Sequence, residues 1–138
     1  MDVGAAVDAL NAALRLQYRS ALQYTLAAGA VAGLEHQHLA DKLWSFALAD
    51  LDDARRLVEK IVTLEGEPTE EVAPLRFAAD ARDALDGLIE AESEALEAIS
   101  YVIEPTGNEA PGEALEHRIE HVIMRKQEQV DYLRRARR

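Results

Sequence analysis

The sequence contains no cysteine among its 138 residues. Disulfide bonds, thiolate metal sites and cysteine nucleophiles are therefore excluded. Aromatic residues are also scarce, at 5%, whereas the 49% of hydrophobic residues consists mostly of Ala and Leu. A composition of this kind favours closely packed helices over a β-sheet.

Positive charge and long apolar runs are lacking as well. The chain has 15 Lys and Arg residues against 26 Asp and Glu residues, a formal net charge of −11. This balance argues against nucleic acid as a partner, because binding phosphates requires a basic face. No apolar run approaches the roughly 18 residues of a membrane span, and the first residues lack the pattern of a signal peptide. We therefore expect a cytoplasmic protein with no membrane partner, folded as a single domain over residues 1–138.

The few prolines separate long segments in which apolar residues recur at helical spacing. This periodicity predicts helices over about residues 3–33, 38–65, 75–103 and 111–138. The first connection, after Gly33, and the third, at residues 104–108, are short. The middle connection, residues 67–74, is longer and contains two prolines. The pattern predicts an all-α fold, an antiparallel four-helix bundle with a crossover between helices two and three.

Each predicted helix also places a polar side chain on its apolar stripe, near mid-length. On the second helix, Asp50 and Asp53 both lie within roughly 40° of Phe46 around the axis, so they point toward the core. Carboxylates in a core are costly unless they are paired, hydrogen-bonded or bound to a metal. The pattern therefore predicts one polar centre inside the bundle, formed by Gln17, Asp50, Asp53, Glu92, Lys126 and Gln129.

Several segments resemble the ferritin-like superfamily, and bacterioferritins in particular. They are LNAALRLQYRSALQYTL at residues 10–26, ARRLVEKIVTLEGEP at residues 54–68, the pair AE that ends in Glu92, and VDYL at residues 130–133. The resemblance implies a ferritin-like bundle and a di-iron ferroxidase centre at the six polar positions. The family pattern there is Glu on helix one, Glu-x-x-His on helix two, Glu on helix three and Glu-x-x-His on helix four. This chain has Gln17, Asp50-x-x-Asp53, Glu92 and Lys126-x-x-Gln129.

The donor set of this chain argues against two iron ions. A neutral amide is a weak donor to iron, and a protonated lysine cannot donate to it at all. We therefore expect Lys126 to take the place of the metal and to donate to Asp50, Asp53 and Glu92. In this interpretation Gln17 and Gln129 satisfy the remaining lone pairs, and Tyr24, similar to a tyrosine near the family's metal centre, is a core tyrosine hydrogen-bonded to the polar set.

We therefore predict a non-catalytic structural or interaction module with no cofactor and no catalytic residue. Three alternatives stay open. One metal ion bound by Asp50, Asp53 and Glu92, or an atypical iron ferroxidase centre, would make the chain an iron-binding or oxidase protein. A small organic ligand could occupy the bundle centre. The aliphatic part of the Lys126 side chain could also carry the ammonium out to solvent, which would leave the acids hydrated.

A second apolar row faces away from the predicted core. Apolar residues on both sides of a helix indicate that the helix is covered twice, and a second copy across a two-fold axis is the natural cover. In bacterioferritins the similar surface forms a dimer in which a Met reaches haem, and Leu51 takes that position here. We therefore expect a homodimer without haem. The family's cages use a fifth helix beyond the point where this chain stops, so we expect no 24-subunit cage. The predicted interface consists of Leu22, Leu26, Trp44, Leu48, Leu51 and Val62.

Two histidines, His117 and His121, are spaced four residues apart on the fourth predicted helix. This spacing lets both rings reach one zinc ion. The pair lies opposite the core stripe, however, and two ligands make a weak site. We interpret both residues as solvated histidines.

Overall fold

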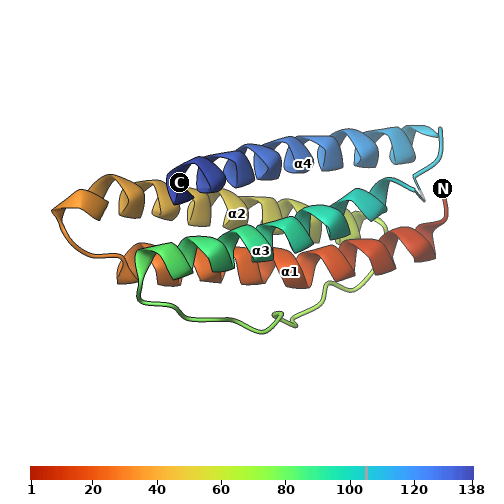
Figure 1. The fold of residues 1–138 in the computed structure, drawn as a ribbon. Coiled ribbons are helices and arrows are strands. Elements are labelled where there is room, and N and C mark those ends of the chain that lie inside the picture. The colour runs from red at the N-terminus through yellow and green to blue at the C-terminus, as the bar shows by residue number, and fades with distance from the viewer. Residues whose placement is uncertain (105) are drawn as a thin grey trace.

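The computed structural model describes residues 1–104 and 106–138, and the residues it describes form helices and loops without a β-strand. In Figure 1 the long helices lie side by side, and a crossover runs along the bundle from the end of the second long helix to the start of the third. The predicted all-α, four-helix architecture is confirmed. The helices are α1 (Val3–Ala30), η1 (Leu34–His36), α2 (Gln37–Thr63), α3 (Ala81–Ser100), η2 (Tyr101–Ile103) and α4 (Ala110–Arg137).

Local sequence signals set several of the helix ends. The Asp2 side chain accepts a hydrogen bond from the backbone N–H of Ala5 at 3.0 Å and caps α1. After α2, Glu65 has a positive φ of 63°, and Gly66 N–H donates to the carbonyl of Ile61 at 2.9 Å. A side chain on Gly66 would lie 2.7 Å from Val7, so the close approach of α1 requires a glycine there. The predicted turn at residues 104–108 includes Pro105, which lies outside the described residues.

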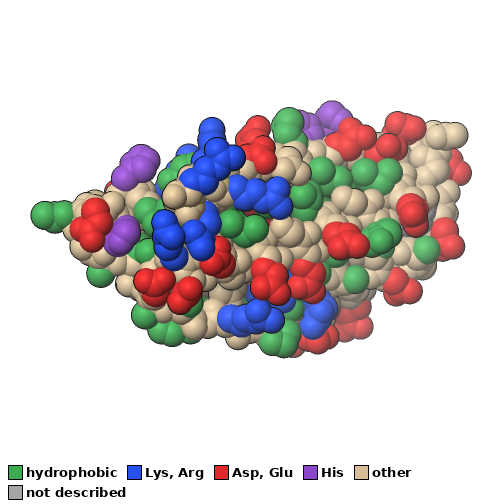
Figure 2. Space-filling model, in the orientation of Figure 1, with side chains coloured by type: hydrophobic (Ala, Val, Ile, Leu, Met, Phe, Trp, Pro, Cys, Tyr) green, Lys and Arg blue, Asp and Glu red, His purple; other side chains and the backbone are tan. Residues whose placement is uncertain are grey.

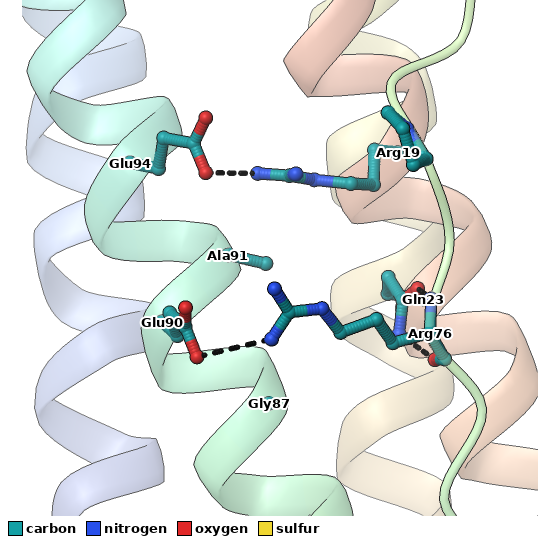
Figure 3. A pocket seen from close by; sticks show the side chains of 8 residues that line it. Arg19, Gln23, Arg76, Gly87, Glu90, Ala91 and Glu94 are labelled. Atoms are coloured by element: carbon teal, nitrogen blue, oxygen red, sulfur yellow. Dashed lines mark hydrogen bonds and ion pairs between the residues drawn. The ribbon is translucent and has the colours of Figure 1, made fainter.

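The third helix differs from the prediction, because it begins at Ala81 rather than near residue 75. The amide of Gln23 on α1 binds both backbone groups of Arg76: its Nε2 donates to the carbonyl at 2.6 Å, and its Oε1 accepts from the N–H at 2.5 Å (Figure 3). These contacts occupy backbone groups that a helix would use internally. Asp80 then caps α3 by accepting from the N–H of Asp83 at 3.1 Å.

The crossover is held along α1 by further polar contacts. Asn11 donates to the carbonyl of Glu67 at 3.0 Å and accepts from the N–H of Thr69 at 2.8 Å. The hydroxyl of Tyr18 donates to the carbonyl of Thr69 at 3.1 Å. Because side chains of α1 satisfy its backbone groups, the crossover keeps a defined path without forming a helix of its own.

The apolar interior contains a small cluster of Leu16, Ala73 and Ala95 and two larger clusters that follow one another along the bundle axis. One of the larger clusters contains Leu10, Leu57 and Ile119. The other contains Leu43 and Leu133. The polar side chains of all four helices lie between these two clusters in sequence, at mid-length of each helix. None of the described helices combines the length and the apolar content that crossing a membrane demands.

Candidate functional site

The six predicted centre residues come together at mid-bundle, and we call this group the polar layer. α1 contributes Gln17, α2 contributes Asp50 and Asp53, α3 contributes Glu92, and α4 contributes Lys126 and Gln129. None of these residues is more than 2% exposed. Their positions follow from helical periodicity, since each occupies the inward stripe of its helix.

Lys126 is the cation at the middle of the polar layer. Its Nζ donates to Oε1 of Glu92 at 2.9 Å and to Oδ2 of Asp50 at 3.4 Å. The second carboxylate oxygen of Glu92, Oε2, accepts a hydrogen bond from the hydroxyl of Tyr24 at 2.9 Å. Lys126 has an exposed fraction of 0%, so the alternative in which its stem carries the ammonium to solvent is wrong.

Asp53 has a different partner from the one expected. Arg125 donates from Nε to Oδ2 at 2.9 Å and from Nη2 to Oδ1 at 2.7 Å, a bidentate pair. The Arg125 side chain is 42% exposed, whereas that of Asp53 is 1% exposed. The guanidinium therefore reaches the buried carboxylate from the edge of the bundle. The expected contact between Asp53 and Lys126 is replaced by the contact with Arg125, whose long side chain precedes Lys126 on α4.

The two glutamines also differ from expectation. Gln17 donates at 3.0 Å to the backbone carbonyl of Asp50 and not to a carboxylate. Within the described parts of the chain, neither amide atom of Gln129 forms a hydrogen bond, and the same holds for Oδ1 of Asp50. The Gln129 amide nevertheless lies close enough to Asp50 to lower its pKa, so it acts on the acid without a well-formed hydrogen bond. Among the described side chains, Lys126 is the one that donates a well-formed hydrogen bond to Asp50, at 3.4 Å.

The charges of the polar layer shift the pKa values of its members. Burial and the negative charge of Glu92 together raise the pKa of Asp50 to about 7, although Lys126 and the amide of Gln129 both act to lower it. Burial alone would lower the pKa of Lys126, but the charges of Asp50 and Glu92 hold it above its ordinary value. Burial and the same two acids raise the pKa of Tyr24, which stays a hydrogen-bond donor. With its pKa of about 7, Asp50 changes its protonation state near neutral pH.

The donor set of the polar layer does not fit a di-iron centre. The Lys126 ammonium lies between two of the acids, and it has no lone pair to offer a metal. Both oxygens of the third acid, Asp53, accept hydrogen bonds from Arg125. Across the described chain, no three His, Asp or Glu side chains are gathered as a metal-binding group.

A cleft between α1, the crossover and α3 lies outside the polar layer (Figure 3). Two ion pairs bridge it: Arg19 to Glu94 at 2.9 Å, and Arg76 to Glu90 at 3.4 Å. Its volume of about 30 Å³ has room for roughly one or two water molecules. We interpret this cleft as part of the attachment of the crossover and not as a ligand site.

Four long helices, a crossover between the second and third, and a buried polar layer at mid-length define a ferritin-like bundle. The family model for the ferritin-like domain matches residues 7–136, and the chain belongs to this family. Among curated proteins, no match is found.

Solved structures show the same fold. A ferritin-like, diiron-carboxylate protein from Bacillus anthracis str. Ames superposes with a TM-score of 0.91 at 26% identity, covering 100% of this chain and 99% of that one. Rhodobacter capsulatus bacterioferritin, solved with a metal-free dinuclear site and a haem iron, superposes with a TM-score of 0.83 at 22% identity, covering 96% and 82%. BfrA from M. tuberculosis superposes with a TM-score of 0.82 at 19% identity, covering 94% and 80%.

Proposed function

We propose that this ferritin-like protein is a non-catalytic structural or interaction module in which an internal ion-pair network replaces a di-iron centre. The observation that carries the proposal is the position of Lys126, fully buried, with its Nζ 2.9 Å from Glu92 and 3.4 Å from Asp50. A buried ammonium between two carboxylates supplies the positive charge that a metal supplies elsewhere in the family.

Binding of iron at this centre would require two existing contacts to break. Lys126 would have to lose its proton or leave the interior, although Asp50 and Glu92 hold its pKa above the ordinary value. Arg125 would have to release both oxygens of Asp53. Removing one partner from a buried ion pair costs about 3–5 kcal/mol, so the ion pairs compete directly with the metal.

One observation favours the competing function, an iron-binding protein with a single ion held by Asp50, Asp53 and Glu92. Oδ1 of Asp50 forms no well-aligned hydrogen bond with the described residues, and burial beside Glu92 raises the pKa of Asp50 to about 7. A cation that displaced Lys126 would relieve both defects. The two functions differ in whether iron binds to the native chain.

Iron content and one charge reversal distinguish the two functions. We expect protein purified without chelator and then offered Fe²⁺ to retain far less than one iron per chain. Lys126→Glu, which restores a family ligand type, is expected to gain iron uptake, whereas Lys60→Glu makes the same charge change outside the polar layer and should gain none. About two irons per native chain, the stoichiometry of a di-iron bundle, would contradict the proposal. So would a ferroxidase activity that Lys126→Glu abolishes.

We further propose that the protein forms a homodimer without haem through the outward face of α1 and α2. All six predicted interface residues are exposed, with Leu51 and Val62 at 58% and 57%. Leu48 and Leu51 line a shallow groove of about 440 Å³ together with Tyr18 and Val58. Large exposed apolar surfaces of this kind indicate an interaction site.

Sedimentation equilibrium tests this interface. The native chain is expected to sediment as a dimer, and Leu51→Glu to sediment as a monomer because it places a charge within the apolar contact. Met124→Glu is a matched control, since Met124 is 55% exposed on α4, a helix that contributes no residue to this face. A native chain that stays monomeric at about 100 µM, well above the range of specific stable dimers, would overturn the interface.

A further inference from the structure

The outer surface of α4 carries a pair of histidines that the polar layer does not use. His117 and His121 are both exposed, and their Nε2 atoms lie 3.2 Å apart. The two rings are nearly perpendicular, with an interplanar angle of 84° and centroids 4.6 Å apart. Figure 2 shows histidine side chains at the upper edge of the molecule, over α4 and beside acidic side chains. The pair is therefore open to ligands from solvent.

The distance between the two nitrogens matches the bite of a metal ion. A Zn–N bond is about 2.0–2.1 Å long, so two nitrogens on one tetrahedral ion lie about 3.3 Å apart. The observed 3.2 Å needs almost no rearrangement of α4. A helix that already holds both ligands on one face avoids most of the ordering cost of binding.

We propose that His117 and His121 form a surface site for one borderline divalent transition-metal ion, bound through both Nε2 atoms with water completing the coordination shell. Imidazole nitrogen suits Cu²⁺ and Zn²⁺, and the Irving–Williams order places Cu²⁺ above Zn²⁺ in affinity. The net charge of −11 raises the local concentration of cations around the chain. The site lies on α4 alone and does not rest on the function proposed for the bundle centre.

Metal binding at this pair has a tautomer signature. Without metal, the 3.2 Å contact requires one Nε2 to carry a proton and donate it to the other. A metal on both Nε2 atoms instead requires both rings to carry their proton on Nδ1. Ring ¹⁵N spectra therefore report directly on coordination, and Zn²⁺ is suitable because it is diamagnetic.

Titration of the full chain with Zn²⁺, followed by calorimetry and ring ¹⁵N spectra, tests the site. We expect one Zn²⁺ per chain and the Nδ1–H tautomer on both rings. His117→Ala or His121→Ala, both substitutions at exposed positions, should weaken binding by at least about 10-fold. The double variant His36→Ala, His38→Ala removes the remaining histidines and should leave the affinity unchanged.

Two results would overturn the site. The first is Zn²⁺ binding that survives His117→Ala with the same affinity. The second is binding that disappears in Asp50→Asn, because that variant alters only the bundle centre. Loss in the α4 variants together with retention in Asp50→Asn assigns the metal to the histidine pair, whatever the iron content of the centre proves to be.

Discussion

Asp50 and Asp53 lie one helical turn apart on α2, and both side chains are almost completely buried, yet their surroundings differ. Asp53 accepts two short hydrogen bonds from Arg125, at 2.9 and 2.7 Å. Asp50 has one contact of 3.4 Å with Lys126, which also serves Glu92 at 2.9 Å. The polar layer thus has two parts. Asp53 and Arg125 form an ion pair at the edge of the bundle, whereas Asp50, Glu92 and Lys126 form an enclosed cluster of two acids and one cation.

This difference shows that burial alone does not set the state of a core carboxylate. Asp53 and Arg125 cancel each other in charge. When all three are ionised, Asp50, Glu92 and Lys126 carry one surplus negative charge. Because the cluster is buried and Glu92 is negative, the pKa of Asp50 is raised to about 7. The enclosed cluster is therefore sensitive to loss of its cation, whereas the edge pair has access to water as a partial replacement.

Removal of Lys126 should have the largest effect on stability. Lys126→Met keeps a side chain of similar length but leaves Asp50 and Glu92 buried without a cation. We expect the free energy of unfolding near pH 8 to fall by about 3–5 kcal/mol, measured by urea denaturation. Lys60→Met on the partly exposed surface of α2 is the matched control and should change it by less than about 0.5 kcal/mol. A loss below about 1 kcal/mol for Lys126→Met would show that the cluster does not depend on its cation.

Removal of Arg125 should have a smaller effect, because its side chain is 42% exposed. Arg125→Ala leaves Asp53 unpaired, but water can enter from the edge, so we expect a loss of about 1–3 kcal/mol. Arg125→Lys retains the charge without the bidentate geometry and should lie between the native chain and Arg125→Ala. Equal losses for Lys126→Met and Arg125→Ala would remove the distinction between the two parts of the layer.

The helices and the inward position of the polar residues could be predicted from the sequence, because helical periodicity determines which face each residue occupies. The start of α3 could not. The sequence of residues 75–80 is compatible with the first turns of the helix. In the structure, however, the amide of Gln23, more than fifty positions earlier in the chain, binds both backbone groups of Arg76. A tertiary contact of this kind overrides local propensity. The local signal of the later start is Asp80, the residue whose side chain caps α3.

The partners within the polar layer were also beyond sequence reasoning. Periodicity places Arg125 at the edge of α4, but the length of its side chain lets the guanidinium turn inward to Asp53. Gln17 faces the centre as predicted, yet it meets the backbone of α2 before it meets a carboxylate. Which partner a side chain can contact depends on how the helices pack against each other, and residue spacing along the chain does not determine this packing.

The hydroxyl of Tyr24 connects the enclosed cluster to the neighbouring apolar core. Tyr24→Phe removes the 2.9 Å hydrogen bond to Oε2 of Glu92 without changing the packing of the ring. We expect the free energy of unfolding to fall by about 1–2 kcal/mol. Tyr132→Phe deletes a hydroxyl from a partly exposed ring that packs against Phe46, and it should have little effect. Similar losses in both variants would mean that the bond to Glu92 contributes nothing specific.

Asp50→Asn should have the smallest effect on stability at pH 8 and the clearest effect on its pH dependence. The folded-state pKa of Asp50, about 7, lies above its unfolded value near 4, so the folded chain holds this proton more tightly. The resulting stabilisation is complete below about pH 4 and is lost as the pH rises through about 7.

Asp50→Asn removes this titration, so the decline in unfolding free energy between pH 5 and pH 8 should become shallower than in the native chain. At pH 8 the variant should lie within about 1 kcal/mol of the native chain or above it, because a neutral amide replaces a poorly neutralised buried charge. Asp8→Asn on the exposed face of α1 removes the same formal charge and should keep the native slope. An unchanged slope in Asp50→Asn would place the titrating proton on another group and would remove the contrast between Asp50 and Asp53.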